Sequence, residues 1–234
     1  MASGDERLTG KDYCVLIVKS VFFFMVMCLA LFLCAGRLSY WQGWALFGLL
    51  AVYVVLSFFL LGKMPGLVRE RMKPGPGTNP WDTVLLAVYG PLSFGLMIFA
   101  ALDSGRFGWS GSLPVWAYVA GWALFLVSYG FVTWAMAVNR WFSSVARIQT
   151  DRGQKVVTQG PYRFVRHPGY LGGIVGFFAT SIVLGSLWGL IGAVLIAIVL
   201  IARTYLEDRM LVRELPGYAD YARKVKWRLV PGGW

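Results

Sequence analysis

The residue of this chain best suited to proton exchange or switchable hydrogen bonding is its single histidine, His167. It lies in the stretch GPYRFVRHPGYLGG, residues 160–173, and an imidazole changes charge near neutral pH. One histidine cannot complete a zinc site, and no cysteine or carboxylate stands near it at ligand spacing, so we predict no metal centre. Pro168 suits the first turn of a helix, so His167 is either part of a site or an ordinary helix-start residue.

A second set of reactive side chains lies at the end of the last apolar tract. Arg203 and Glu207 are separated by one helical turn, which places them on one helix face, and Asp208 is adjacent. Ionisable groups this close to an apolar tract are usually paired with one another or functional. The spacing allows two interpretations: a capping Arg203–Glu207 ion pair at the membrane interface, or part of a site.

The elements that must carry these residues are membrane helices. Hydrophobic residues make up 58% of the 234 residues and charged residues 14%, and the mean hydropathy is +0.62, which excludes an ordinary soluble globular protein. A helix needs about 20 apolar residues to cross the hydrocarbon layer. We therefore predict an all-α, polytopic integral membrane protein with about six transmembrane helices, the first four over residues 13–35, 44–61, 81–102 and 114–138.

The last apolar tract, residues 170–203, is too long for one span and too short for two spans with a loop. Its centre reads LGSLWG, and Gly185, Ser186 and Gly189 can break a helix there. We predict a C-terminal helical hairpin of two tightly joined helices, the first of them short. A single long, tilted helix is the alternative.

The distribution of positive charge predicts the orientation in the membrane. Of the 22 lysines and arginines, only Arg37 and Arg106 fall in the turns after the first and third spans. Because positive loops stay inside, both termini are predicted to be cytoplasmic. The net charge of +11 then lies largely on one membrane face, where anionic lipid headgroups are the expected partners and nucleic acid is not needed.

The loop over residues 62–82 is rich in proline and glycine and carries Lys63, Arg69, Arg71 and Lys73. These cations act either as topology signals or as part of a loop that covers a site.

Polar sequence flanks the predicted hairpin on both sides, over residues 139–169 and after Arg203. Folding the hairpin back on itself would bring these segments together at the cytoplasmic surface. We therefore divide the chain into an N-terminal four-helix membrane region, 1–138, and a core, 139–234, which together form one integrated membrane domain. The core is predicted to hold a cytoplasmic pocket.

One combination of motifs spans residues 139–232. In order, they are N..FS, GPYRFVRHPGYLG, an apolar hairpin, R...ED..L, GY..Y and RLVPG. This order resembles the isoprenylcysteine carboxyl methyltransferase family and the related membrane phospholipid methyltransferases. The resemblance implies that S-adenosylmethionine binds in a cytoplasmic pocket of the last hairpin and C-terminal segment, and that a lipophilic or prenylated acceptor enters from the bilayer.

The resemblance also implies roles for individual residues. Glu207 and Asp208 match the acidic pair that holds the polar end of the cofactor, and Arg203 is our choice for the residue nearest the acceptor, so Arg203 and Glu207 are the predicted catalytic residues. The segment expected to line the cofactor comprises Tyr162, His167, Pro168, Tyr170, Leu171 and Gly172. The chemistry agrees, because S-adenosylmethionine needs acids for its ammonium, donors for its carboxylate and aromatic walls around its sulfonium.

The sequence also departs from the family pattern. Asp208 stands where a second glutamate is common, Gln154 stands where prenylcysteine enzymes often have histidine, and AGWALF lacks the Gly-x-Gly of phospholipid methyltransferases. The acceptor is therefore left open among a carboxylate, a thiol and an amine. An NADPH-dependent sterol or steroid reductase is the alternative function, because such enzymes share an Arg-His-Pro segment, and a non-enzymatic membrane scaffold is the third.

Overall fold

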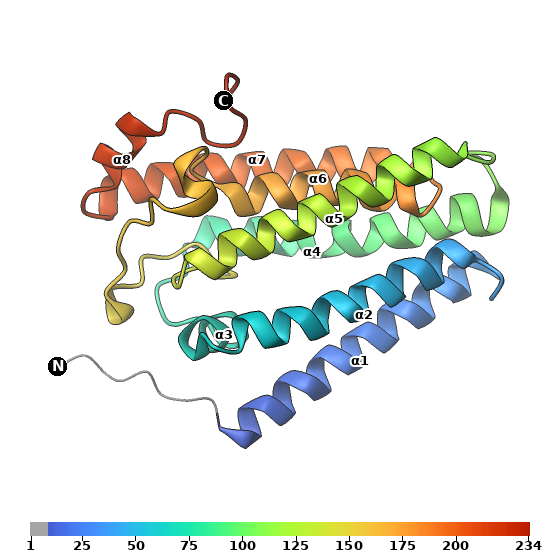
Figure 1. The fold of residues 1–234 in the computed structure, drawn as a ribbon, viewed down its shortest axis with the longest axis horizontal. Helices are drawn as coiled ribbons and strands as arrows, with labels where there is room; N and C mark the ends of the chain where they lie inside the picture. Colours follow the sequence, from blue (N-terminus) through green and yellow to red (C-terminus); the bar gives the residue numbers. More distant parts are fainter. Residues whose placement is uncertain (1–8) are drawn as a thin grey trace.

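The computed structural model describes residues 9–234. The N-terminus, which is predicted to be cytoplasmic, lies outside the described residues. Within that range the chain is helical and has no strand (Figure 1), which confirms the predicted all-α class. The helices are α1 (Gly10–Ala35), α2 (Trp41–Leu61), α3 (Pro65–Met72), α4 (Pro80–Ala100), the π-helix η1 (Ala101–Phe107), α5 (Val115–Val138), the short 3₁₀ turns η2 (Thr150–Arg152) and η3 (Gly160–Arg163), α6 (Pro168–Val183), α7 (Gly189–Glu214) and α8 (Tyr218–Lys224).

Local sequence signals account for the ends of several helices. Thr9 and Asp12 form a capping box at the start of α1, with the Asp12 amide donating to Thr9 Oγ1 at 3.2 Å and the Thr9 amide donating to the Asp12 carboxylate at 2.8 Å. Gly36 ends α1 with a left-handed φ of 68°. Pro80 and Pro168 open α4 and α6, where their missing N–H groups cost nothing.

Among residues 9–234, five helices are long and apolar enough to cross a membrane: α1, α2, the continuous α4–η1 segment, α5 and α7. The sixth apolar helix, α6, has 16 residues. At 1.5 Å per residue it is about 24 Å long, which is shorter than the roughly 30 Å hydrocarbon layer. The predicted polytopic helical architecture is confirmed, with five full-length helices and a short sixth.

The last apolar tract forms the predicted hairpin, and the alternative of one long helix is wrong. The break lies between Val183 and Gly189, and Gly185 adopts a left-handed φ of 76° there. The fully buried carboxylate of Asp103 in η1 accepts a hydrogen bond from Ser186 Oγ at 2.6 Å, which holds the turn in place. Tyr40 adds a second tie, since its hydroxyl donates to the Leu184 carbonyl at 2.6 Å.

Close packing between α5 and α6 fixes the short helix. A Cβ atom added at Gly172 would lie 2.5 Å from Val132 Cγ2 and 3.0 Å from the Ser128 carbonyl oxygen, so this contact requires glycine. Small residues permit such approach between membrane helices. Gly172 is thus a packing residue, whereas a Cβ at Gly173 would meet only Leu200 Cδ1, at 3.6 Å.

The polar parts of the chain gather at one end of the bundle. Figure 1 shows α3, the connection between α5 and α6, and α8 at this end, opposite the α1–α2 and α6–α7 turns. The segments that flank the hairpin are therefore brought together as predicted, and they meet the loop that follows α2.

Candidate active site

A cavity of about 480 Å³ begins among these polar segments and continues between the helices. Its polar wall comes mainly from the connection between α5 and α6 and from the ends of α7 and α8, and includes Asn139, Gln149, Gln154, Arg166, His167, Glu207 and Tyr218. Its apolar and aromatic wall comes from α2, α4, α5, α6 and α7, and includes Tyr53, Leu86, Tyr89, Tyr129, Val132, Phe177 and Leu200. One cavity thus joins a polar surface to the interior of the helical bundle.

Most of the residues singled out from the sequence line this cavity. They are Tyr162, His167, Pro168, Tyr170, Gly172, Arg203 and Glu207. Leu171 and Asp208, which were expected in the same set, are not among its lining residues. Cofactor binding by any of these residues remains a prediction.

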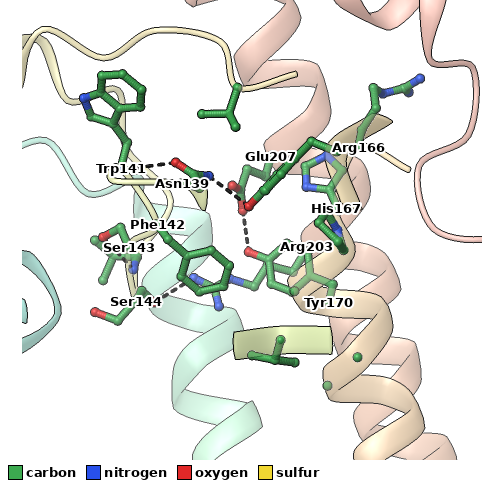
Figure 2. A pocket seen from close by; sticks show the side chains of 18 of the residues that line it. Asn139, Trp141, Phe142, Ser143, Ser144, Arg166, His167, Tyr170, Arg203 and Glu207 are labelled. Atoms are coloured by element: carbon green, nitrogen blue, oxygen red, sulfur yellow. Dashed lines mark hydrogen bonds between the residues drawn. The ribbon is translucent and has the colours of Figure 1, made fainter. Parts of the chain in front are cut away.

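Glu207 is the carboxylate in the cavity wall, and its side chain is partly accessible. The Tyr170 hydroxyl donates a hydrogen bond to it, and the Tyr170 ring stacks on His167 with centroids 5.7 Å apart. Beside Glu207, Asn139 Nδ2 donates to the Tyr162 hydroxyl at 2.9 Å (Figure 2). Burial raises the pKa of Tyr162, so this phenol stays neutral. The wall therefore presents one carboxylate, together with aromatic rings, neutral hydrogen-bonding groups and several cationic side chains.

Arg203 is paired with Asp82 at the start of α4, not with Glu207. Arg203 Nε donates to Asp82 Oδ1 at 2.6 Å and Nη2 to Oδ2 at 3.1 Å, and Nη2 also donates to the Ser144 carbonyl at 2.9 Å. The expected Arg203–Glu207 capping pair is wrong, because spacing along α7 fixes the shared face but α4 supplies the nearer carboxylate. Asp82 was missed, although an acid in the first turn of a predicted span was a signal for it.

These bonds change what Arg203 can offer to an acceptor. Both arms of its fork contact Asp82, which is fully buried and also accepts from the Ala146 amide at 2.7 Å. The two N–H groups of Nη1 remain for a ligand. Arg203 therefore cannot bind a ligand carboxylate with parallel hydrogen bonds from two of its nitrogens. The predicted catalytic role of Arg203 is untested, and its structural role is to tie α7 to α4 and to the segment after α5.

Asp208 is the centre of a buried ionic cluster behind the cavity wall. Arg166 donates to both of its oxygens at 2.8 Å, Arg228 Nε donates to Oδ2 at 2.8 Å, and the Tyr218 hydroxyl donates to Oδ1 at 3.0 Å. Burial by itself would lower the pKa of Arg166, but the Asp208 carboxylate outweighs it and raises that pKa. Asp208 is 2% exposed, so it positions its partners at the cavity wall rather than facing the cavity.

His167 combines the two roles that its sequence position allowed. It is the residue before Pro168 at the start of α6, and its backbone amide donates to the Arg228 carbonyl at 2.9 Å. Its Nε2 lies 3.3 Å from Asp208 Oδ1 and 3.4 Å from the Tyr218 hydroxyl. His167 is thus both a helix-start residue and a residue of the cavity wall, oriented by the Asp208 cluster.

A third buried ion pair fixes the loop after α2 to the site. Arg147 Nε donates to Glu70 Oε1 at 2.9 Å, and Nη2 donates to Glu70 Oε2 at 2.8 Å. Burial would raise the pKa of Glu70, but hydrogen bonds from Arg147 and Ser143 outweigh it and leave that pKa below its ordinary value. Asp151 also pairs with Arg147, at 2.8 Å. The loop over residues 62–82 is therefore held against the segment after α5, and its Arg71 lines the cavity; whether the loop covers a site stays a prediction.

The comparisons with known proteins agree with this arrangement. Residues 116–216 match the model of the phospholipid methyltransferase family. Over 107 residues the chain is 30% identical to two proteins named "Probable protein-S-isoprenylcysteine O-methyltransferase", one from Oryza sativa subsp. indica and one from Oryza sativa subsp. japonica. The alignment covers 44% of this chain and 56% of each relative, so the chain spans little more than half the length of the curated relatives it matches.

The matched region contains α5, α6, α7 and the connection that supplies most of the polar wall. Neither comparison supports the reductase alternative. The resemblance drawn from the motifs is confirmed for this region, because residues 116–216 match the model of the phospholipid methyltransferase family and the two relatives are named as isoprenylcysteine methyltransferases.

Proposed function

We propose that this protein is an S-adenosylmethionine-dependent methyltransferase that acts on a lipophilic acceptor, isoprenylcysteine-like or lipid-like, at the cytoplasmic membrane face. The observation that carries the proposal is the single cavity that joins a polar wall containing Glu207 to an aromatic and apolar interior. A methyl donor is polar and a lipid-like acceptor is not, so an enzyme that joins them needs both environments in contact.

The chemistry of the lining residues fits the proposed cofactor. Glu207 is an accessible carboxylate for an ammonium group, and Arg166 and His167 are donors for a carboxylate. Aromatic side chains, including Trp141 and Phe142, supply walls that favour a sulfonium (Figure 2). Asp208 would act indirectly, by holding Arg166 and His167 in place.

S-adenosylmethionine, when bound, would supply a methyl group that is attached to a positively charged sulfur. A carboxylate oxygen of the acceptor can accept this methyl group directly, and the products are a methyl ester and a neutral thioether, with no proton transfer. The chain's own contribution is then to hold two reactants in contact and exclude water. The buried pairs Arg203–Asp82 and Arg147–Glu70 keep the walls rigid enough for that task.

The two regions predicted from the sequence would act as one unit. Tyr53, Arg71 and Tyr89 from region 1–138 line the same cavity as Glu207 and His167 from region 139–234. This shared lining supports one integrated membrane domain in which the N-terminal helices shape the acceptor side.

Calorimetry on the full chain in detergent tests the proposal. S-adenosylmethionine and NADPH are titrated separately, and transfer of a labelled methyl group to a prenylated cysteine is then measured. We expect S-adenosylmethionine to bind and the label to move. Tight binding of NADPH with no binding of S-adenosylmethionine would overturn the proposal.

A further inference from the structure

Arg71 is a cavity-lining arginine that has no carboxylate partner among residues 9–234. Three other arginines line the cavity, and each pairs with a buried or partly buried carboxylate: Arg147 with Glu70, Arg166 with Asp208 and Arg203 with Asp82. Within residues 9–234, no carboxylate forms an ion pair with Arg71. Its recorded contact is with the ring of Phe142, with the guanidinium carbon 5.6 Å from the ring centroid.

The position of Arg71 makes this charge available to a ligand. Its side chain remains accessible because it projects into the cavity, while protein surrounds it closely enough that burial lowers its pKa. An arginine keeps its proton at such sites. A cation held in a protein cavity without a counter-ion is costly, and a bound anion would remove that cost.

The side chains around Arg71 suit a ligand that has a lipophilic chain and an anionic end. Tyr53 and Tyr89 lie within electrostatic reach of its guanidinium. Tyr53 packs edge-on against Tyr129 with ring centroids 4.9 Å apart, and Tyr89 packs against Phe177 at 5.8 Å. These aromatic residues face the interior of the bundle, where an acyl or prenyl chain is stable.

Phe142 links Arg71 to the start of α6. Phe142 contacts Arg71 on one side, and on the other its ring lies so near Gly169 that a Cβ there would be 2.6 Å from it. Gly169 and Tyr170 belong to the start of α6, which is expected to line the cofactor. Arg71, Phe142 and Gly169 all line the one cavity, so a group held by Arg71 would lie near the segment expected to line the cofactor.

We propose, building on the proposed function, that Arg71 binds the carboxylate of the methyl acceptor and that the acceptor is an isoprenylcysteine-like acid. The guanidinium fork matches a carboxylate with two parallel hydrogen bonds. A carboxylate also needs no base, which suits a wall where Glu207 is bound to Tyr170 and His167 to Asp208. An amine acceptor would need one of those groups to take its proton. The sequence had suggested Arg203 as the residue nearest the acceptor, but the Nε and Nη2 groups of Arg203 are bound to Asp82. We therefore assign the binding of the acceptor carboxylate to Arg71.

Binding measurements without cofactor test this assignment. The probes are an N-acylated S-prenylcysteine with a free carboxylate and the matching primary amide, each titrated into the full-length protein in detergent. The variants are Arg71→Gln and Arg71→Lys. Lys73→Gln is the matched control, because it removes the same charge from the same loop at an exposed position that does not line the cavity.

We expect the wild-type protein and Lys73→Gln to bind the acid more tightly than the amide. Arg71→Gln should weaken binding of the acid by roughly 10-fold to 100-fold and leave the amide unchanged, as expected for the loss of a charge-assisted pair. Arg71→Lys should be intermediate, since a point charge cannot reproduce the fork. Arg71→Gln should not lower the unfolding temperature, because Arg71 forms no ion pair within residues 9–234.

Two results would overturn the assignment. One is an Arg71→Gln variant that still prefers the acid over the amide. The other is a wild-type protein that binds the acid and the amide equally, together with binding of ethanolamine phospholipid vesicles that is lost in Arg71→Gln. That result would identify a lipid phosphate as the ligand of Arg71. Failure of the wild type to bind S-adenosylmethionine is a separate result, since it contradicts the proposed function and not the comparison of acid with amide.

Discussion

Glu207 and Asp208 are neighbours in the sequence, yet their side chains have different surroundings. Asp208 is enclosed by Arg166, Arg228 and Tyr218, whereas Glu207 opens to the cavity. Residues one position apart on a helix point about 100° away from each other, so an adjacent acidic pair seldom serves one ligand equally. The two carboxylates therefore have different roles in the structure, with Glu207 facing the cavity and Asp208 supporting its wall.

The first prediction concerns Glu207. Glu207→Gln preserves size but removes the charge proposed to face the ammonium of S-adenosylmethionine. A charge-assisted hydrogen bond contributes about 1.5–3 kcal/mol, so the dissociation constant should rise by roughly 10-fold to 100-fold. Calorimetry measures this directly. Glu214→Gln, at an exposed position near the end of the same helix, is the control and should bind as the wild type does; equal affinity in both variants would contradict the assignment.

A second prediction concerns Asp82, the buried partner of Arg203. Asp82→Asn leaves the Arg203 guanidinium buried without its counter-ion, and breaking a buried pair costs roughly 3–5 kcal/mol. The variant should unfold at a clearly lower temperature or denaturant concentration in detergent. Asp220→Asn, which breaks an exposed pair with Arg223, should change stability little. If the two variants lose the same stability, the Arg203–Asp82 pair does not hold α7 to α4.

At the scale of the elements, the short helix α6 explains how polar residues come to lie beside an apolar cavity. Its 16 residues do not need to span the bilayer, because α5 and α7 flank it and Asp103 holds the turn that follows it. Its first turn therefore starts at the level of the polar segments, where His167 and Tyr170 reach the cavity. A full-length helix here would have carried these residues farther from the interior of the bundle.

The contact between α5 and α6 yields the third prediction. Gly172→Ala places a methyl group 2.5 Å from Val132 Cγ2 and 3.0 Å from a backbone carbonyl, so the helices must separate. Such overpacking costs roughly 1–3 kcal/mol, more than the gain of about 1 kcal/mol from replacing glycine in a helix. We expect a lower unfolding temperature for Gly172→Ala.

Gly173→Ala is the internal control for this measurement. The added methyl group would lie 3.6 Å from Leu200 Cδ1, an ordinary contact, so the helix propensity of alanine should dominate. Its unfolding temperature should stay the same or rise. If both variants behave alike, the tight α5–α6 contact is not what fixes α6.

For the whole molecule, the polar end of the bundle determines where the reaction would take place. Most lysines and arginines lie in segments that meet at this end, and the cavity opens among them. A polar methyl donor is present in the cytoplasm, so the proposed function requires this end to face it.

The fourth prediction is therefore one of topology. An epitope tag at the C-terminus should be protected in intact cells and accessible after permeabilisation, whereas a tag in the turn over residues 103–113 should be accessible from outside. The positive-inside rule is the physical basis. Detection of the C-terminal tag on intact cells would separate the cavity from the cofactor supply and contradict both the orientation and the proposed function.

Hydropathy and local helix signals were sufficient to predict the membrane architecture. The four first spans agree with α1, α2, α4 and α5 to within a few residues, and the glycine and serine residues of LGSLWG marked the break between α6 and α7. These features are properties of one segment at a time: whether about 20 residues are apolar, and whether a turn residue interrupts them. The motif order over residues 139–232 overlaps the region that matches the phospholipid methyltransferase family, although that match begins earlier, at residue 116 in α5, and ends at residue 216.

The pairing of charged side chains was decided by tertiary structure. Arg203 pairs with Asp82, 121 positions away, although Glu207 lies one turn along the same helix. Arg71 was grouped with three other cations of its loop, and only the packing of α3 against the segment after α5 turns it toward the cavity. Spacing within a segment specifies which residues share a helix face, but the partner across that face depends on how helices from distant parts of the chain rotate and pack against each other.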